Sequence, residues 1–471
     1  MKTPTDPAVR KLHDWIDSHK DEMVSALQGA LRIPSVEGYP EPGAPYGAKV
    51  REALDYTLAL TESLGFRTRN IDGHAGDAEF GKGDAYIGAI GHLDVVPEGD
   101  GWSKPPYGAV LEGGYLYSRG ASDDKGPTYA ALFGAKALLD SQLPLSRRVR
   151  LIFGCNEESG FGCVHHYFDV AKEERPLYAF TPDASFPLIY AEKGIANIVL
   201  EQPYPERSEG VRIAMANGGR RPNMVPDYAE ATLAGPQSAL VNLAMELDSF
   251  WDRNVHFRSD SDTLTIMSTG KSAHGSSPTA GDNAIARLAR TLISLGLAEQ
   301  APWAGWILST VDPYGCGLGI AGKDDVAGQL TSNLGIMEFT DEGNIRLTYN
   351  IRYPVTWKSE QLTELGSDAW QKGGWNLKDL IDQPPLFVPL DQEPVSTLLR
   401  VYREETGDET SQPGTMGGGT YARATPRAVA FGASFPDSSD GPAHEPDERF
   451  AVDTYLNAAK IFAHALYELA K

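Results

Sequence analysis

The sequence is poor in cysteine and in long apolar runs. Its three cysteines, Cys155, Cys163 and Cys316, cannot all pair with one another and show no CxxC spacing, which argues against a disulfide framework or a zinc ribbon and fits a reducing compartment. No apolar stretch approaches the roughly 20 residues that cross a bilayer. The charged segment 1–22 lacks the apolar region of a secretory signal. We therefore expect a cytoplasmic protein without a membrane span.

Positive charge is also scarce. Lysine and arginine number 42 against 64 aspartates and glutamates, a formal net charge of −22. Such a deficit works against any partner bound by neutralising phosphates, so nucleic acids and anionic membranes are poor candidates. The 471 residues, with 41% hydrophobic and 23% charged side chains, predict a globular chain of two domains.

The chain alternates helix-like and strand-like segments up to about residue 190 and again from residue 394. This alternation predicts an α/β domain with a mostly parallel central sheet and helices on both faces. The predicted helices cover 9–33, 49–64, 127–141, 395–405 and 452–470, and the predicted strands cover 85–91, 148–153 and 428–431.

Between these segments the pattern changes to openly alternating strands. Segments 211–216, 263–267 and 345–352 have this pattern, and 283–294 has a helical one. We expect an α+β domain, 192–386, inserted into a domain formed by 1–191 and 387–471.

Metal-ligand residue types recur directly after the apolar strands of the first domain. In open α/β sheets the carboxyl ends of the strands line the ligand crevice, so such side chains can converge there. Each fragment alone also fits a histidine satisfied in the core or a solvated acidic helix cap. The candidates are His92, Asp94, Asp123, Asp124, Glu157, Glu158, Asp183 and His444.

Taken together, two histidines and three carboxylates can supply ligands for two metal ions about 3.5–4 Å apart. Asp94, two residues after His92, can hold the ring nitrogen that faces away from a metal. Adjacent glutamates at 157 and 158 allow one to bind a cation while the other moves protons.

Six fragments in this order resemble the family of co-catalytic metal-dependent amidohydrolases that includes aminoacylases, glutamate carboxypeptidases and desuccinylases, and most closely the branch of the dipeptidase PepV. The resemblance covers nearly the whole chain. The fragments are Gly91-His92-Leu93-Asp94, Gly120-Ala121-Ser122-Asp123-Asp124-Lys125-Gly126, Glu157-Glu158-Ser159-Gly160, Pro182-Asp183, Gly270-Lys271-Ser272-Ala273-His274-Gly275 and His444-Glu445.

The resemblance implies specific roles. His92, Asp123 and Asp183 would hold one metal, with Glu158 and His444 on the other and Asp123 bridging both. The ions would be zinc in the first place, with manganese or cobalt as alternatives. The other implied features are support of His92 by Asp94, a bridging water activated by the base Glu157, and a cis peptide bond between Asp123 and Asp124.

The inserted domain resembles the lid of the family. His274 would hydrogen-bond the developing oxyanion, and Arg352 would clamp a substrate carboxylate. Asn223 also matches a lid position, while Gly419 and Thr420 belong to a glycine-rich turn that could receive an anion. The alternatives are a solvated loop for His274, a surface arginine for Arg352 and a plain tight turn for the glycines.

Two features favour a dipeptidase that acts on small unblocked peptides. The inserted segment 192–386 is longer than the lid of dimeric members, which implies a working monomer, and position 183 is Asp where many relatives have Glu. In one departure, Asn156 stands where an acidic residue is common. The alternatives are an N-acyl or N-succinyl amino acid amidohydrolase and, in another class, a non-catalytic metal-binding or peptide-binding protein.

Overall fold

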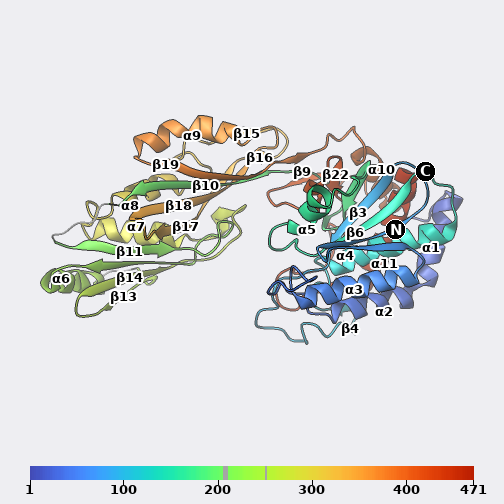
Figure 1. The fold of residues 1–471 in the computed structure, drawn as a ribbon, viewed down its shortest axis with the longest axis horizontal. Coiled ribbons are helices and arrows are strands. Elements are labelled where there is room, and N and C mark those ends of the chain that lie inside the picture. Colours follow the sequence, from blue (N-terminus) through green and yellow to red (C-terminus); the bar gives the residue numbers. More distant parts are fainter. Residues whose placement is uncertain (205–209, 250–251) are drawn as a thin grey trace. The chain divides into compact units, whose positions relative to one another are not determined.

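The computed structural model describes residues 1–204, 210–249 and 252–471, and the chain divides into two units (Figure 1). The first unit comprises Met1–Ala191, Leu386–Thr415 and Gly419–Lys471, and the second comprises Glu192–Pro385 with Met416–Gly418. The short segment Met416–Gly418 differs from the expectation, which placed it in the first domain. It joins the second unit because Lys193 N donates to Met416 O (3.0 Å) and Arg352 Nη1 donates to Gly417 O (2.8 Å).

The first unit is built on a nine-stranded sheet of order β1-β2-β6-β3-β7-β22-β9-β20, with β21 pairing with β9. The central strands β6, β3, β7 and β22 are parallel, and antiparallel pairs flank them. The predicted mostly parallel sheet is therefore confirmed. The strands are β1 (Arg67–Ile71), β2 (Ala75–Phe80), β3 (Tyr86–His92), β6 (Arg148–Gly154), β7 (Tyr178–Thr181), β9 (Ile189–Glu192), β20 (Leu386–Phe387), β21 (Gly414–Met416) and β22 (Ala428–Ala430).

Long helices cover one face of this sheet, where α4 and α11 run side by side against β3 and β6 (Figure 1). Gly91 of β3 lies against Thr128 of α4, while on the other face Gly154 lies against the ring of Tyr421. None of the helices in the described ranges is both long and apolar enough to cross a membrane. The helices are α1 (Pro7–Ser18), α2 (Lys20–Leu31), α3 (Ala48–Ser63), α4 (Lys125–Ser141), α5 (Gly162–His165), the π-helical turn η1 (His166–Val170), α10 (Val395–Thr406), the 3-10 turn η3 (Tyr421–Ala424) and α11 (Val452–Ala470).

Two of the predicted helices of the first unit differ from the structure by more than one residue at an end. The single helix predicted over 9–33 is two helices, α1 and α2, because the chain leaves helical geometry at His19. The His19 ring stacks on Trp15, and its Nδ1 contacts Trp15 O at 2.7 Å. Helix α4 starts two residues before the predicted Pro127, which is tolerated in a first helical turn because the N–H groups there have no helical partner.

Smaller sheets complete the first unit around the ends of the large one. A three-stranded sheet joins β24 (Arg449–Ala451), β5 (Tyr115–Tyr117) and β4 (Val110–Glu112), and β8 (Ala184–Ser185) pairs in parallel with β23 (Ala433–Ser434). These pairings tie the C-terminal part of the chain to loops of its N-terminal half.

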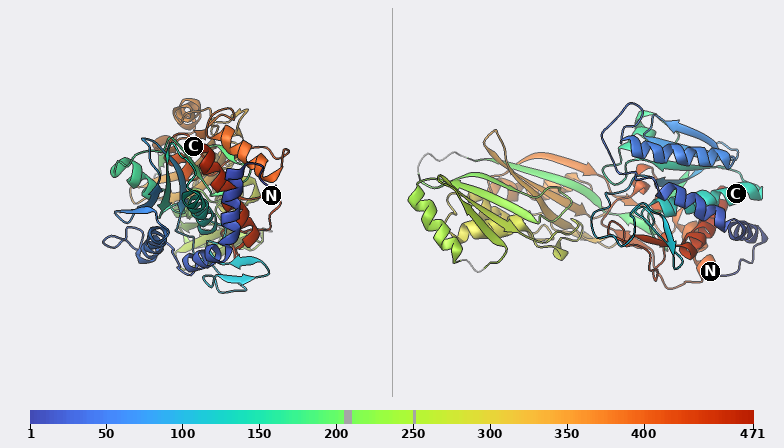
Figure 2. Two further views of the ribbon diagram at one scale, coloured as in Figure 1. Left: turned by 90° about the vertical axis from the view of Figure 1, so that its right-hand side faces the viewer. Right: turned by 90° about the horizontal axis from the view of Figure 1, so that it is seen from below.

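The second unit is built on an antiparallel eight-stranded sheet of order β13-β14-β12-β11-β17-β18-β10-β19. Figure 2 shows the strands and helices of this unit from two further sides. Helix α7 packs on β12 and β14, and α8 packs on α7. The strands are β10 (Gly194–Pro203), β11 (Arg212–Gly218), β12 (Tyr228–Ala234), β13 (Val255–Ser259), β14 (Thr263–Thr269), β17 (Thr331–Phe339), β18 (Asn344–Tyr353) and β19 (Asn376–Gln383), with the pair β15 (Lys323–Asp324) and β16 (Gly328–Gln329) outside the sheet. The helices are α6 (Gln237–Asp248), the 3-10 turn η2 (Pro278–Ala280), α7 (Ala284–Ser294), α8 (Pro302–Thr310) and α9 (Glu360–Lys372).

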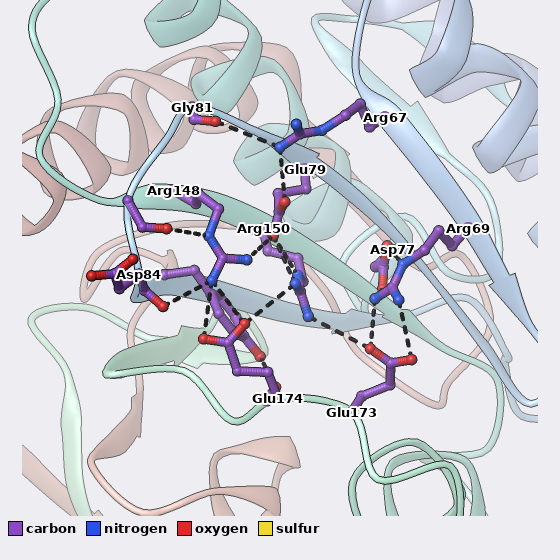
Figure 3. A network of polar contacts seen from close by, with 12 residues as sticks. Arg67, Arg69, Asp77, Glu79, Gly81, Asp84, Arg148, Arg150, Glu173 and Glu174 are labelled. Atoms are coloured by element: carbon purple, nitrogen blue, oxygen red, sulfur yellow. Dashed lines mark hydrogen bonds and ion pairs between the residues drawn. The ribbon is translucent and has the colours of Figure 1, made fainter.

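A network of arginines and carboxylates ties the antiparallel edge of the first sheet together (Figure 3). Glu79 of β2 lies at its centre, where it pairs with Arg67 (2.9 Å), Arg148 (2.8 Å) and Arg150 (2.7 Å). Burial acts to raise the pKa of Glu79, but hydrogen bonds from Arg150 and Arg148 outweigh it and lower the pKa below its usual value. The ionised carboxylate therefore stabilises this edge.

We expect Glu79→Gln to lower the free energy of unfolding at pH 7 by about 2 kcal/mol, because charge-assisted hydrogen bonds are lost. An unfolded glutamate has a pKa of about 4.3. Because the folded pKa is lower, the stabilisation is complete above that pH and disappears as the pH falls through the folded pKa. Urea unfolding at pH 7 and about pH 3.5 checks this. Glu62→Gln, at an exposed position on α3, is the control and should change little. A loss of stability that is equal at both pH values would contradict the prediction.

Candidate metal centre

The predicted metal-binding residues come from the carboxyl ends of neighbouring parallel strands. His92 is the last residue of β3, Glu157 and Glu158 follow β6, and Asp183 follows β7. Because these strands are parallel neighbours, their carboxyl ends share one edge of the sheet. Asp123 comes from the loop before α4.

The fifth ligand position, His444, comes from far along the chain. It lies in the loop between β23 and β24, with a φ of 65°. Its Nε2 lies 3.1 Å from Asp123 Oδ2 and 3.1 Å from Glu158 Oε2. The loop thus brings a C-terminal imidazole to carboxylates of the N-terminal half.

Asp123 lies between the two imidazoles. Its Oδ1 is 3.1 Å from His92 Nε2, and its Oδ2 is 3.1 Å from His444 Nε2. The Asp123–Asp124 peptide bond is cis, as the family resemblance implied. One carboxylate that presents each oxygen to a different imidazole can bridge two cations.

Asp183 and the two glutamates complete the cluster. Asp183 Oδ2 lies 4.0 Å from His92 Nε2. Ligand atoms of His92, Asp123 and Glu158 all lie within 4.8 Å of one another, as do those of His92, Glu157 and Asp183. The structure thus brings the five predicted ligands and Glu157 to one place.

The cluster concentrates negative charge in a partly enclosed space. Burial is the main cause that raises the pKa values of Glu157, Glu158 and Asp183, and repulsion from Asp123 adds to it. The pKa of Asp123 itself is lowered, because hydrogen bonds from His444 and His92 outweigh its burial. Hydrogen bonds to Asp123 and Glu158 raise the pKa of His444 to about 10.

This donor set fits divalent cations. Carboxylates that lie this close together repel one another when they are ionised. A positive charge placed among them stabilises the ionised forms. Imidazole nitrogens and carboxylate oxygens together suit zinc, manganese and cobalt alike. The residues that would hold the ions are His92, Asp123, Glu158, Asp183 and His444.

Asp94 supports the cluster in a different way from that predicted. His92 Nδ1 lies 2.9 Å from the backbone carbonyl of Asp94 but 3.5 Å from its carboxylate. The carboxylate instead accepts the backbone N–H of Glu157 (2.9 Å) and that of Glu158 (3.1 Å). The backbone carbonyl of Asp94 therefore orients the His92 ring, and its carboxylate holds the backbone of Glu157 and Glu158.

Asn156, the departure from the family pattern, organises the turn that carries the two glutamates. Its Nδ2 donates to Ser159 Oγ (2.7 Å), and its Oδ1 accepts from Gly162 N (2.9 Å). Ser159 Oγ in turn donates to Glu37, and the backbone N–H of Asn156 donates to the hydroxyl of Tyr421 (3.3 Å). The amide can donate and accept at once, which a carboxylate cannot.

The sequence analysis missed Glu448, which anchors the loop that carries Asp123. Its Oε1 accepts from Ser122 N (2.8 Å) and Asp123 N (3.2 Å), and its Oε2 pairs with Arg119 Nη1 (2.7 Å). Glu448 and Arg119 are both buried. The available signal was the acidic residue four positions after His444, but nothing in the sequence pairs it with the segment 119–123.

The roles of Asp124 and Lys125, next to the bridging aspartate, were also missed. Asp124 Oδ2 accepts from His92 N (3.2 Å) and Thr128 Oγ1 (2.8 Å), and burial raises the pKa of Asp124 to about 7. Lys125 Nζ donates to the carbonyls of Ala30 (3.0 Å) and Ile33 (2.8 Å), and burial lowers its pKa to about 7. The acidic pair is therefore not a solvated helix cap.

The predicted lid residues lie in the second unit. His274 and Asn223 are on paired segments, with Gly275 N donating to Asn223 O (2.7 Å). Arg352 is only 3% exposed, which excludes a surface arginine, and its Nε donates to Asn350 Oδ1 (2.9 Å).

The residues of the glycine-rich turn, Gly419 and Thr420, belong to the first unit. Thr420 Oγ1 accepts from Ala422 N (3.2 Å) at the start of the 3-10 turn η3, so its hydroxyl serves as a cap. Gly419 lies close to the Arg423 side chain. A Cβ at position 419 would lie only 2.7 Å from Arg423 Nε.

The carboxyl edge of the parallel strands thus gathers two imidazoles, the carboxylate of Asp123 between them, and Glu157, which is not among the assigned ligands. These are the residue types of a metallopeptidase site. The model of peptidase family M20/M25/M40 matches residues 88–468, and the chain belongs to that family. It is therefore a peptidase of a metal-dependent family, as the motifs predicted.

Proteins similar to this chain cover nearly all of it. A protein of Bacillus subtilis (strain 168) named "Putative dipeptidase YtjP" is 38% identical over 460 residues, covering 96% of this chain and 98% of that protein. The crystal structure of an M20 family metallo-carboxypeptidase from Sulfolobus solfataricus is similar with a TM-score of 0.56 at 19% identity, covering 95% of this chain and 99% of that one. The crystal structure of human carnosine dipeptidase 1 is similar with a TM-score of 0.55 at 17% identity, and the match covers 99% of both chains. The structural likenesses show the fold.

We expect Glu448→Gln to weaken metal binding about 10-fold to 100-fold, because the loop that presents Asp123 loses part of its anchor. Competition titration of zinc against a chelator of known affinity measures this. Asp453→Asn, at an exposed position of α11, is the matched control and should bind as the wild type does. Unchanged affinity in Glu448→Gln would show that the loop holds Asp123 without it.

Proposed function

We propose that this peptidase is a metal-dependent dipeptidase that hydrolyses the peptide bond of short, unblocked dipeptides. The main observation behind the proposal is the position of Asp123 between the imidazoles of His92 and His444, with Glu157 beside them. The similarity to a bacterial protein named as a dipeptidase supports the substrate class.

Glu157 is the proposed general base. Bound divalent ions would supply polarisation of the scissile carbonyl and a lowered pKa for the attacking water. Glu157 takes the proton from that water and passes it to the leaving amine. Burial is the main cause that raises the pKa of Glu157, which makes the carboxylate a stronger proton acceptor, and the hydrogen bond from its backbone N–H to Asp94 fixes its place.

Substrate contacts are assigned to His274, Arg352 and Asn223 of the second unit and to two residues of the first unit, Gly419 and Thr420. We assign to His274 a hydrogen bond to the developing oxyanion. Arg352 clamps the terminal carboxylate with its planar guanidinium, which limits the length of the substrate. Asn223, Gly419 and Thr420 are further candidates for contact with the substrate backbone or carboxylate.

The proposal includes two metal ions per chain, zinc in the first place, and a working monomer in the cytoplasm. The bridging position of Asp123 supports the pair of ions, and the three free cysteines fit a reducing compartment. Elemental analysis of protein purified without chelators and light scattering measure the metal content and the oligomeric state.

The activity is tested with a panel of unblocked dipeptides beside N-acetyl and N-succinyl amino acids, each with zinc, manganese or cobalt. We expect the dipeptides to be hydrolysed with the highest kcat/KM. Preference for the acylated amino acids would replace the proposal by an amidohydrolase. Metal binding without turnover of any compound would indicate a binding protein.

We expect Glu157→Gln to lower kcat by about 10²–10⁴-fold, because the isosteric amide cannot accept the proton. The metal content should stay at the wild-type level, since Glu157 is not among the assigned ligands. Single-turnover kinetics and elemental analysis on the same preparation measure both. Activity within tenfold of the wild type would remove Glu157 from the role of base.

We expect Arg352→Ala to raise KM and lower kcat for dipeptides, because the substrate carboxylate loses its charged partner. Arg352→Lys should recover little, since an ammonium cannot form the two parallel hydrogen bonds. Kinetics on a dipeptide and on its C-terminal amide separate the clamp from general damage, because only the free acid should be affected. Equal losses on both substrates would contradict the clamp.

A further inference from the structure

Two groups of Ser276, its hydroxyl and its backbone N–H, contact the same ring nitrogen of His274, Nδ1. The Ser276 hydroxyl lies 2.6 Å from His274 Nδ1, and the backbone N–H of Ser276 donates to the same nitrogen at 3.3 Å. A backbone N–H can only donate, so Nδ1 acts as the acceptor. In a neutral imidazole the ring proton is then on Nε2.

We propose that Ser276 is a positioning residue that fixes His274 in the Nε2–H tautomer. The inference rests on the proposed function, in which His274 donates a hydrogen bond to an oxyanion. An imidazole in the other tautomer would present a lone pair at Nε2 and repel that oxygen. Ser276 acts through His274 and does not itself touch the substrate.

The segment that carries His274 is held in place by backbone pairing. Val225 N donates to Ala273 O (2.9 Å), and Gly275 N donates to Asn223 O (2.7 Å). The turn at 222–224 is in turn bound to β17, because Asn333 Nδ2 donates to Pro222 O (2.9 Å) and to Met224 O (2.8 Å). The contact between Ser276 and His274 is therefore made within an ordered pair of loops.

Gly417 packs against the side chain of Ser276 from outside this loop pair. A Cβ at position 417 would lie 2.9 Å from Ser276 Cβ, closer than real side chains approach. The Gly417 carbonyl accepts from Arg352 Nη1 (2.8 Å). A continuous set of contacts thus links Arg352, the proposed carboxylate clamp, through Gly417 and Ser276 to His274.

The inference is tested with Ser276→Ala, with Ser277→Ala as the matched control. The Ser277 hydroxyl makes no hydrogen bond within the described ranges of the chain. We expect Ser276→Ala to lower kcat about tenfold with little change in KM, the low end of the loss when a partner that orients a functional imidazole is removed. Ser277→Ala should match the wild type. Equal kinetics for Ser276→Ala and the wild type would overturn the proposal.

A second readout is independent of activity. Nitrogen-15 NMR of labelled histidine in the zinc-loaded protein should show His274 as the Nε2–H form in the wild type and in Ser277→Ala. A measurable Nδ1–H population should appear in Ser276→Ala and in Gly417→Ala, in which the new methyl group displaces Ser276. A wild-type ring protonated on Nδ1 would contradict the assignment.

A double-mutant cycle separates positioning from a structural effect. If Ser276 acts through His274, Ser276→Ala should not lower kcat further in a His274→Ala background. Additive losses would mean that Ser276 stabilises the loop independently of the ring. If the wild type hydrolyses no dipeptide, the proposed function fails, while the NMR result still decides the tautomer assignment.

Discussion

The position of Asp123, with one oxygen toward each of two imidazoles, is the constraint on which the site depends. The loop that carries this carboxylate is held from several sides. The backbone N–H groups of Ser122 and Asp123 donate to Glu448, and α4 starts two residues after Asp123. Much of the surrounding structure therefore serves to fix one side chain.

The acids next to the carboxylate cluster accept hydrogen bonds from backbone N–H groups. Asp94 accepts hydrogen bonds from the backbone N–H groups of Glu157 and Glu158. Glu448 accepts those of Ser122 and Asp123, and Asp124 accepts that of His92. Each of these acids uses its charge on backbone donors. None of them is among the proposed ligands, but their hydrogen bonds position the segments that carry those residues.

The sequence predicted that the candidate ligands lie close together, because their placement follows from local patterns. An apolar run that ends in His or in adjacent acids is a strand end, and parallel strands share an edge, so His92, Glu158 and Asp183 had to lie close together. Helices such as 49–64 and 452–470 were found for the same reason, since apolar spacing is local information.

The parts that the sequence did not predict depend on contacts between distant segments. The contact of Glu448 with Ser122 and Asp123 joins positions more than 300 residues apart, and no periodicity encodes it. The break at His19, by contrast, is a local feature, where the ring stacks on Trp15, but the apolar pattern of the sequence does not indicate it. Asp94 was correctly placed, but a sequence does not say whether its carbonyl or its carboxylate faces the ring.

The late position of His444 and Glu448 in the chain has a consequence for synthesis. A ribosome that has translated the first 440 residues has made every strand of the main sheet, yet the nascent protein still lacks one imidazole and the anchor of the aspartate loop. The cluster of proposed ligands is therefore complete only after His444 has been synthesised, and its anchor only after Glu448.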